Sequence, residues 1–335
     1  EALETASHLK VIVLDKTGTI TKGRPELTDV LPFESFDEEE LLRLAAAADK
    51  QSEHPLAAAI VAGARTRGIE ASEPEAFNAV PGHGVEATVE GRRVQVGNRK
   101  LLERAGVSLN EFEQSASRLA DEGKTPMFVA VDGRPAGIIA VADTLKEDSL
   151  AAIRVLQRMG LEVVMMTGDN ERTARAIARQ AGIERVLAEV LPEEKARQIE
   201  LLQTDAHLLV GMVGDGINDA PALAQADIGF AIGTGTDVAI EAADITLVGG
   251  SLRGVVTAIE VSRATLKNIR QNLFGAFIYN ALGIPIAAGV LYPVFGLLLS
   301  PIIAGAAMAA SSITVVTNAN RLRFFAARTL KEKAV

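Results

Sequence analysis

Residues 11–21 read VIVLDKTGTIT, an apolar run that ends in a carboxylate and a small polar loop. A continuous apolar stretch of this length predicts a parallel strand that is buried on both faces. Open α/β sheets bind their ligands beyond the carboxyl ends of the strands, which is where Asp15 would lie. Lys16 and the loop after it offer positive charge and backbone N–H groups to a phosphate. By itself, an Asp-Lys pair after a strand also fits an ordinary turn.

Polar loops also follow two later apolar runs. TGDN at 167–170 follows residues 161–166, and GDGINDAP at 214–221 follows residues 207–213. Between them, Lys195 lies at the head of a helix-patterned segment. Any one of these loops fits ordinary turn chemistry, since Gly, Asp and Asn favour such places. Four such sites in order, each beside a predicted βα unit, instead indicate a shared phosphoryl-transfer site, which needs a nucleophile, Mg²⁺ and phosphate ligands.

The segment DKTGTIT resembles the phosphorylation motif of the P-type ATPases, whose Asp takes the γ-phosphoryl group of ATP, and the later motifs follow in that family's order. The resemblance implies that Asp15 is the nucleophile and that Asp15, Thr17 and Asp215 face Mg²⁺. The other catalytic positions would hold the phosphate or support the metal cluster: Lys16, Thr17, Thr167, Gly168, Asp169, Lys195, Asn218 and Asp219.

Thr17 distinguishes two enzyme classes. Soluble phosphatases of the same haloacid dehalogenase-like superfamily usually carry a second Asp two residues after the nucleophile, as a general acid/base. With Thr at that position, an aspartyl phosphate has no resident base and is expected to persist. A long-lived acyl phosphate suits a pump, and a membrane-anchored phosphatase is the less favoured alternative.

Composition sets outer limits on the function. The 335 residues are 48% apolar, and the mean hydropathy of +0.20 is consistent with some membrane-buried sequence. The net charge of −9 argues against a nucleic-acid partner. The sequence has no Cys, which excludes disulfides and Cys-based metal sites within it. It begins at Glu1 without a signal peptide, and we expect it to be part of a longer chain.

The expected fold class is α/β: a haloacid dehalogenase-like, doubly wound phosphorylation domain with an inserted α+β nucleotide-binding domain and a C-terminal transmembrane helical hairpin. Residues 1–25 and 137–255 would form the phosphorylation domain and residues 26–136 the insertion. The insertion shows helical patterns at 38–48 and 55–67 and strand patterns at 85–89, 92–96 and 127–131, with the turn pairs Glu90-Gly91 and Asp132-Gly133. A linker helix at 256–270, two membrane helices within 271–320 and a basic cytoplasmic tail at 321–335 complete this prediction.

SEHP at 52–55 fits, by itself, a helix N-cap followed by an early Pro. Together with Gly82-His83-Gly84 and Gly97-Asn98 it resembles the nucleotide domain of heavy-metal P-type ATPases. That resemblance implies an ATP site with His54 against the adenine ring, made of Asp49, Glu53, His54, Gly82, Gly84 and Asn98. The family commonly has Glu five residues before the His, so Asp49 would reach less far. His83 is expected to be an exposed loop residue.

Residues 271–320 contain no charged side chain. The stretches 272–292 and 295–317 are each long enough to cross a bilayer as helices, with Tyr292-Pro293 at the turn. A pair of buried core helices is the alternative. The basic flanks place both ends in the cytoplasm; they comprise Arg263, Lys267, Arg270, Arg321, Arg323 and Arg328. We therefore expect an integral membrane protein of the bacterial plasma membrane with cytoplasmic catalytic domains.

Polar residues inside the predicted spans suggest the cargo. YN at 279–280 and MAASS at 308–312 resemble the last two membrane helices of Cu(I)-transporting P-type ATPases, which implies Tyr279, Asn280, Met308 and Ser312 as Cu(I) ligands. A thioether suits Cu(I), whereas the Zn²⁺/Cd²⁺ branch places charged residues here. Ag(I) resembles Cu(I) too closely to be separated.

The function implied is ATP-driven export of Cu(I), with ATP and Mg²⁺ as cofactors. The same resemblance implies three partners: an upstream actuator domain, an upstream membrane helix with a Cys-Pro-Cys site, and a copper chaperone.

Overall fold

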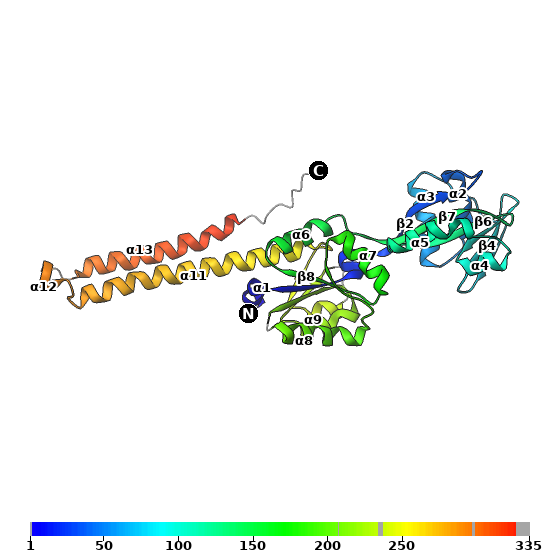
Figure 1. Cartoon of the computed structure of the whole chain (residues 1–335). Helices are drawn as coiled ribbons and strands as arrows, with labels where there is room; N and C mark the ends of the chain where they lie inside the picture. The colour runs from blue at the N-terminus through cyan, green and yellow to red at the C-terminus, as the bar shows by residue number, and fades with distance from the viewer. Residues whose placement is uncertain (1, 207, 234–236, 297–298, 326–335) are drawn as a thin grey trace.

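The computed structural model describes residues 2–206, 208–233, 237–296 and 299–325, with the backbone alone at 205, 206 and 217. Two β-sheets and a long helical hairpin lie in a row, and the first sheet is between the hairpin and the second sheet (Figure 1). His207, where the predicted third strand began, and the tail from 326 onwards, including Arg328, lie outside the described residues.

The middle unit is a six-stranded parallel sheet with the order β12-β11-β10-β1-β8-β9. Its strands are β1 Val11–Asp15, β8 Glu162–Met166, β9 Arg185–Leu187, β10 Val210–Gly214, β11 Ile228–Ile232 and β12 Ile245–Leu247. Its helices are α1 Ala2–His8, α6 Ser149–Arg158, α7 Glu171–Ala181, α8 Lys195–Ala206, α9 Ala220–Gln225 and α10 Asp237–Ala242. Ile12 and Leu14 pack with α6 and α7, whereas Val11 and Val13 pack with α8 and α9. Both faces of β1 are buried, which explains its unbroken apolar sequence.

The second unit is a six-stranded antiparallel sheet with the order β2-β7-β6-β5-β4-β3. Its strands are β2 Thr21–Pro32, β3 Ala76–Val80, β4 Gly84–Val89, β5 Arg92–Gly97, β6 Thr125–Val131 and β7 Arg134–Leu145. Its helices are α2 Glu38–Asp49, α3 Pro55–Thr66, α4 Arg99–Arg104 and α5 Glu113–Asp121. Val129 and Val131 pack on the side of α2 and α3, whereas Phe128 and Ala130 pack on the side of α4 and α5. This alternation fits a sheet covered by helices on both faces.

The predicted hairpin turns lie where the sequence placed them. Glu90 and Asp132 have positive φ angles of 53° and 52°, and the glycines that follow them have φ of 73° and 76°. Two successive positive φ angles are the geometry that X-Gly pairs favour in two-residue hairpin loops.

Two long strands connect the units. β2 and β7 pair from Thr21 with Leu145 to Pro32 with Gly137. The predicted borders at residues 25 and 137 therefore fall inside these strands, because the chain does not turn where its composition changes. The two paired strands lead from the loop after Asp15 into the second sheet (Figure 1).

The hairpin consists of α11 Arg253–Ala287 and α13 Pro301–Asn320, joined at its tip through α12 Tyr292–Phe295. α11 is one continuous helix, so the predicted linker helix at 256–270 and the first predicted span are not separate elements. Tyr292-Pro293 lies in the connection at the tip, as predicted; Pro293 is in the first turn of the short helix α12, and Gly296 ends that helix in the left-handed region. The second helix begins at Pro301 rather than at 295, where Ser300 accepts the N–H of Ile302 as its N-cap.

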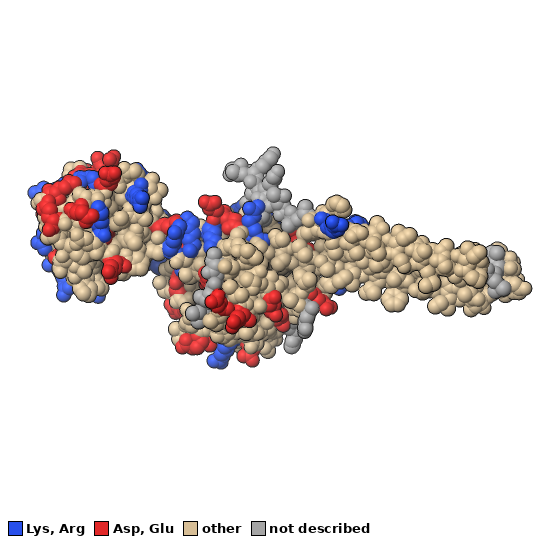
Figure 2. All heavy atoms as spheres, turned by 180° about the vertical axis from the view of Figure 1, so that it is seen from behind, with Lys and Arg blue, Asp and Glu red and all other residues tan. Residues whose placement is uncertain are grey.

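The hairpin is apolar on the outside. Figure 2 shows Lys and Arg gathered at its base, and no charged residue along the shaft that faces the viewer. In the described part of the chain, one helix is long and apolar enough by composition to cross a membrane, the stretch Pro301–Phe324. The matching half of α11 carries Asn272, Asn280 and Pro285, which lower its hydropathy. None of the residues of α13 is buried, which disfavours a core helix.

Candidate functional site

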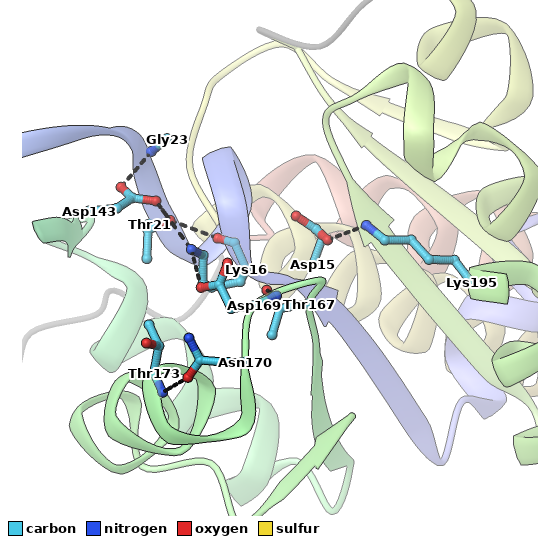
Figure 3. Close-up of polar contacts among 10 residues, drawn as sticks. All are labelled: Asp15, Lys16, Thr21, Gly23, Asp143, Thr167, Asp169, Asn170, Thr173 and Lys195. Carbon is cyan, nitrogen blue, oxygen red and sulfur yellow. Dashed lines mark hydrogen bonds and ion pairs between the residues drawn. The ribbon is translucent and has the colours of Figure 1, made fainter. Parts of the chain in front are cut away.

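The candidate active site lies at the carboxyl ends of three neighbouring strands, β1, β8 and β10 (Figure 3). Asp15 ends β1, Thr167 follows β8, and Asp215 follows β10. Because the three strands are parallel, their last residues meet at one edge of the sheet. The structure therefore brings three of the predicted motifs together around Asp15.

Lys195 joins two buried carboxylates. Its Nζ donates to Asp15 Oδ1 and to Asp219 Oδ1, at 2.6 Å each. Lys195 is the first residue of α8, so the backbone turn before that helix aims its side chain across the strand ends. Asp15 itself is 5% exposed, so little of its surface is open to solvent.

The acid cluster perturbs its own protonation. Burial raises the pKa of Asp15 to about 7, and the Asp219 carboxylate adds to the rise, while Lys195 opposes it. Burial, followed by Asp219, also raises the pKa of Asp215. Burial alone would lower the pKa of Lys195, but Asp15 and Asp219 outweigh it and raise that pKa. A cation bound among these carboxylates would favour their ionised forms.

Carboxylate oxygens of Asp15, Asp215 and Asp219 lie within 4.8 Å of one another. Such an oxygen cluster suits Mg²⁺, which takes oxygen ligands and usually keeps several waters. Asp219 is already occupied, because its Oδ1 accepts from Lys195 and its Oδ2 accepts the N–H groups of Asp215 and Gly216 at 3.3 and 3.2 Å. Asp219 therefore shapes the loop, and Asp15 and Asp215 are the carboxylates open to a cation. The side chain of Thr17, the third predicted contact, is exposed.

Gly18 makes room for this arrangement. Its φ is +73°, and a Cβ at this position would lie 1.8 Å from Asp215 Oδ2. A side chain at position 18 would therefore displace the Asp215 carboxylate as well as strain the backbone. The small residue in the DKTGT loop is required by the approach of the GDG loop.

Lys16 does not contact Asp15, although the sequence suggested a phosphate contact beside it. Its Nζ donates to Asp169 Oδ2 at 2.7 Å and lies 3.8 Å from Asp143 Oδ2. Figure 3 shows Lys16 directed toward these carboxylates while Lys195 reaches Asp15. Two acids attract the ammonium more strongly than the partly neutralised Asp15 does. Lys16 and Asp169 together mark the edge of the site nearest the second sheet.

The remaining predicted positions are divided between the interior and the rim. Thr167 is buried, and its Oγ1 accepts the N–H of Asp169 at 3.1 Å. Asn170 caps α7 by accepting the N–H of Thr173 at 3.0 Å. Gly168 and Asn218 are exposed at the rim and are not part of the carboxylate cluster.

Two residues were missed by the sequence reasoning. Asp143 accepts from Thr21 Oγ1 at 2.6 Å and from the Gly23 N–H at 2.8 Å, so it ties β7 to the start of β2. Lys146 donates to the carbonyls of Gly18 and Gly250, and burial lowers its pKa while Asp215 opposes that. The signal available was their place in the chain: both lie where the insertion returns to the parallel sheet.

A separate pocket of about 310 Å³ lies on the second unit, on the side of α3 and β4. It is lined by five of the six residues predicted to bind ATP: Asp49, His54, Gly82, Gly84 and Asn98. Glu53 is exposed and is not among the lining residues. His83, which we expected to be an exposed loop residue, is instead half-buried and lines the same pocket.

His54 has two roles in this geometry. Its Nδ1 accepts the N–H of Leu56 at 3.2 Å, so it is the N-cap of α3, with Pro55 in the first turn. Its side chain is also exposed and lines the pocket. His54 can therefore cap α3 and contact a ligand at the same time, because the cap uses one ring nitrogen and leaves the ring face open.

Asp49 is 3% exposed, and its Oδ2 has no hydrogen-bond partner within the described chain. Burial raises the pKa of this carboxyl to about 7. An orphaned buried carboxyl in the wall of a pocket is costly unless a ligand satisfies it. The shorter Asp therefore remains a suitable partner for a polar ligand edge in the pocket.

Glycines and an amide bring the backbone close to the pocket. Gly84 has a φ of +142°, and a Cβ there would lie 2.2 Å from the Val96 carbonyl oxygen. Asn98 donates from Nδ2 to the Gly82 carbonyl at 2.9 Å, and its Oδ1 accepts the N–H of Leu101 as the cap of α4. The loop at 82–84 is thus held against β5, and the pocket wall there is backbone.

A cavity of about 250 Å³ lies between the pocket and the acid cluster. Leu56 and Thr125 line both the pocket and this cavity, and Lys16 and Asp169 line the cavity. An elongated ligand seated in the pocket on the second unit can therefore extend toward the strand ends of the first.

The predicted Cu(I) ligands lie on the two hairpin helices. Asn272 accepts from Asn318 at 2.8 Å, which fixes the register of α11 against α13. Eight residues nearer the tip of the hairpin on each helix, or roughly 12 Å at 1.5 Å per residue, Asn280 on α11 lies at a depth similar to that of residues 308–312 on α13. Asn280 and Ser312 donate to backbone carbonyls of their own helices, at 3.0 and 3.2 Å, and Met308 is 70% exposed.

Residues 9–227 match the description "haloacid dehalogenase-like hydrolase". The chain belongs to the haloacid dehalogenase-like hydrolases. It is 55% identical to a probable copper-transporting ATPase of Synechococcus elongatus, an alignment that covers 98% of this chain and 44% of that protein. It is 54% identical to a copper-exporting P-type ATPase of Bacillus subtilis, over 96% of this chain and 39% of that protein. The chain thus spans about two fifths of the length of these relatives.

A crystal structure of a zinc-transporting PIB-type ATPase is 38% identical and superposes with a TM-score of 0.83, covering 96% of this chain and 51% of that one. These findings confirm the predicted resemblance to the copper-transporting P-type ATPases. They also confirm the predicted fold class, since the family match covers the inserted sheet and the strands β1, β8, β9 and β10 of the parallel sheet, and the superposition covers 96% of this chain.

Proposed function

We propose that this chain is the ATP-binding and autophosphorylating part of a P-type ATPase that exports Cu(I) across a membrane, with Mg²⁺ at the phosphorylation site. The observation that carries the proposal is the buried Asp15 at the sheet edge, between Lys195 and Asp215. Asp15 would attack the γ-phosphorus of ATP and displace ADP, and the bond formed is an acyl phosphate.

The chain's own residues have distinct tasks in that step. Lys195 balances the charge on Asp15 and would then meet an oxygen of the transferred phosphoryl group. Asp15 and Asp215 would hold Mg²⁺, which spreads the negative charge of the phosphates. Thr167 is buried beside Asp15 and orients the Asp169 loop that binds Lys16.

The pocket on the second unit is the proposed adenosine site. The ring of His54 would stack on adenine, and the Asp49 carboxyl would bond to its polar edge. The triphosphate would pass through the adjoining cavity past Lys16 toward Asp15. This division assigns nucleotide recognition and phosphoryl chemistry to different sheets.

Copper is the proposed cargo because the relatives at 54–55% identity are named as copper-transporting or copper-exporting ATPases, whereas the zinc-transporting ATPase of known structure is 38% identical. The stretch 271–320, which has no charged side chain, agrees with a soft, monovalent ion. Zn²⁺/Cd²⁺ or Ag(I) transport, and a membrane-anchored phosphatase, are the alternatives. Metal-stimulated ATP hydrolysis by a form that includes the upstream residues would separate Cu(I) and Ag(I) from Zn²⁺ and Cd²⁺. We also propose that the protein lies in the bacterial plasma membrane and that a copper chaperone is one of its partners.

The test is acyl-phosphate formation. Incubation with ATP labelled at the γ-phosphorus and with Mg²⁺ is expected to label the chain with an acid-stable, hydroxylamine-labile phosphate. The label should vanish in Asp15→Asn and persist in the control Asp132→Asn, a hairpin-turn carboxylate on the second sheet. Label retained by Asp15→Asn would refute the proposal. If this chain by itself hydrolyses the labelled aspartyl phosphate within seconds, that result would favour the phosphatase alternative.

A further inference from the structure

A basic pocket of about 590 Å³ lies at the base of the hairpin, outside the sites described above. It is formed by the end of α1 and the middle of α11, and its lining includes Ser7, His8, Arg263, Lys267, Arg270 and Phe274. No Asp or Glu is among the described residues that line it. The pocket therefore carries uncompensated positive charge.

The side chains of this pocket follow one face of α11. Arg263, Lys267, Arg270 and Phe274 are spaced by four, three and four residues, which places them in one stripe along the helix. Three cations come first, and an aromatic side chain that is 70% exposed follows one turn later. Phe277, also 68% exposed, continues the apolar part of the stripe.

The three cationic side chains of the pocket make different contacts. Arg263 donates to the carbonyls of Ser7 and Met159, at 3.3 and 3.0 Å, and so fastens α1 to the parallel unit. Arg270 lies 3.3 Å from His8 Nε2, which orients its guanidinium over the pocket. Lys267 is exposed between them. Arg263 is thus structural, whereas Lys267 and Arg270 are available to a ligand.

We propose that this pocket binds the phosphate headgroup of an anionic phospholipid, with an acyl chain along Phe274 and Phe277. The charge pattern selects a phosphate, and the change from cations to exposed aromatics within two helical turns matches the boundary between headgroup and acyl chain. A free phosphate would satisfy the cations but leave the aromatic half of the stripe unused. Arg321 at the end of α13 adds charge at the same depth, since it donates to Asn318, which bonds to Gln271 of the pocket.

The test measures lipid retention by native mass spectrometry on the purified chain in a neutral detergent. Phosphatidylglycerol and phosphatidylcholine with the same acyl chains are titrated separately. We expect retention of phosphatidylglycerol about tenfold stronger than of phosphatidylcholine, because two cations face its net negative headgroup. Lys267→Gln/Arg270→Gln should abolish the difference, while Lys267→Arg/Arg270→Lys should keep it, which separates loss of charge from loss of fold.

Arg65→Gln/Lys100→Gln is the matched control, since both of these side chains are exposed on the second unit and the charge removed is the same. It should leave lipid retention unchanged. Phe274→Ala should lower the retention of long-chain phosphatidylglycerol several-fold. Equal retention of the two lipids, equal loss in the control, or full displacement of phosphatidylglycerol by millimolar inorganic phosphate or glycerol 1-phosphate would each overturn the proposal.

Discussion

Asp49 is a buried acid in the wall of the adenosine pocket, and its environment determines how it responds to pH. The unfolded carboxyl has a pKa of 3.8, and burial without a partner raises the folded value to about 7. Between these values the folded chain holds a proton that the unfolded chain has released. The stabilising contribution is therefore complete below pH 3.8 and is lost as pH rises to 7, after which it stays constant.

Because the raised pKa of Asp49 makes the folded chain lose stability as pH rises, a variant that cannot ionise at this position should not show that loss. Asp49→Asn keeps the shape and cannot ionise, so its thermal midpoint relative to that of the native chain should rise steadily from pH 5 to 7 and level off above pH 7. Differential scanning fluorimetry across this range measures it. Asp37→Asn is the control, because Asp37 caps α2 and Asn caps a helix equally well. A flat difference for Asp49→Asn would show that its carboxyl is ionised throughout.

His54 offers a sharper test of the adenosine site, because its two roles separate by substitution. Asn keeps the helix cap and removes the ring, whereas Ala removes both. His54→Asn is expected to weaken ATP binding about tenfold through lost stacking, with little change in stability. His54→Ala should show the same loss in binding plus about 1 kcal/mol of destabilisation.

Isothermal titration with a non-hydrolysable ATP analogue measures the affinity of these variants. Phosphorylation from acetyl phosphate serves as the internal control, since that donor has no adenine for the second sheet to hold. Equal loss with both donors would assign His54 to the cap alone.

At this residue level, the placement of Asp15, Lys195 and Asp215 in one cluster, and of five predicted residues in one pocket, was predictable, because each lies in a short motif at a strand end or a turn. The partner of Lys16 was not predictable. Its choice of Asp169 and Asp143 over Asp15 depends on which carboxylates are already neutralised, and on β7 returning beside β2. Such competition between charges exists only after the two sheets are placed.

At the element scale, the alternating and continuous apolar patterns located six of the twelve described strands to within about three residues: β1, β4, β5, β6, β8 and β10. The ends of the hairpin helices were less predictable. α11 ends at Ala287, and α13 begins at Pro301 after the N-cap Ser300, whereas the apolar run continues through both ends. The long pairing of β2 with β7 was also missed, because it joins segments more than a hundred residues apart in sequence.

A contact between α5 and α7 links the two sheets. Arg172 donates to Asp121 Oδ1 at 2.8 Å and to the Ser117 carbonyl at 3.1 Å, and Arg179 donates to the Asp121 carbonyl at 3.2 Å. α7 begins directly after the TGDN loop, so this contact connects the loops around Asp15 to the second sheet. Arg172 and Asp121 are 51% and 63% exposed in their side chains, and solvent screens the pair, which limits it to about 0–1 kcal/mol.

We therefore expect Arg172→Ala to shift the relative placement of the two sheets about twofold in population, without unfolding either sheet. The chain has no Cys, so spin labels at Lys100→Cys and Arg158→Cys report one distance, measured by electron–electron double resonance. The distribution should broaden in Arg172→Ala. Arg175→Ala, on the same helix but paired within it to Glu171, should leave the distribution unchanged. Identical distributions for Arg172→Ala and the unsubstituted chain would show that the β2–β7 ribbon alone sets the placement.

At the scale of the whole molecule, the chemistry and the membrane part lie at the two ends of one continuous element. α11 starts against the parallel sheet, where Val255 and Ile259 are buried in its core, and ends in the hairpin. At the base of the hairpin an amide network joins the helices: Asn268 donates to the Asn318 carbonyl at 2.7 Å and accepts from Asn272 at 3.0 Å. Any rotation of the parallel-sheet unit would therefore be passed to both hairpin helices together.

The membrane part of this chain offers a transported ion few strong ligands. Met308 supplies one thioether, Tyr279 a phenol, and Asn280 and Ser312 already bond to their own backbone. Cu(I) prefers several sulfur ligands, so we expect the chain alone to bind ATP but to show no tight copper site and no copper-stimulated turnover. Copper titration in detergent, read by X-ray absorption, checks this. In a form that includes upstream thiolates, Met308→Ala should lower copper activation at least tenfold while ATP affinity stays unchanged, and Ser311→Ala is the control for that variant. Stoichiometric sulfur-bound copper in the chain alone would show that its own hairpin holds the site.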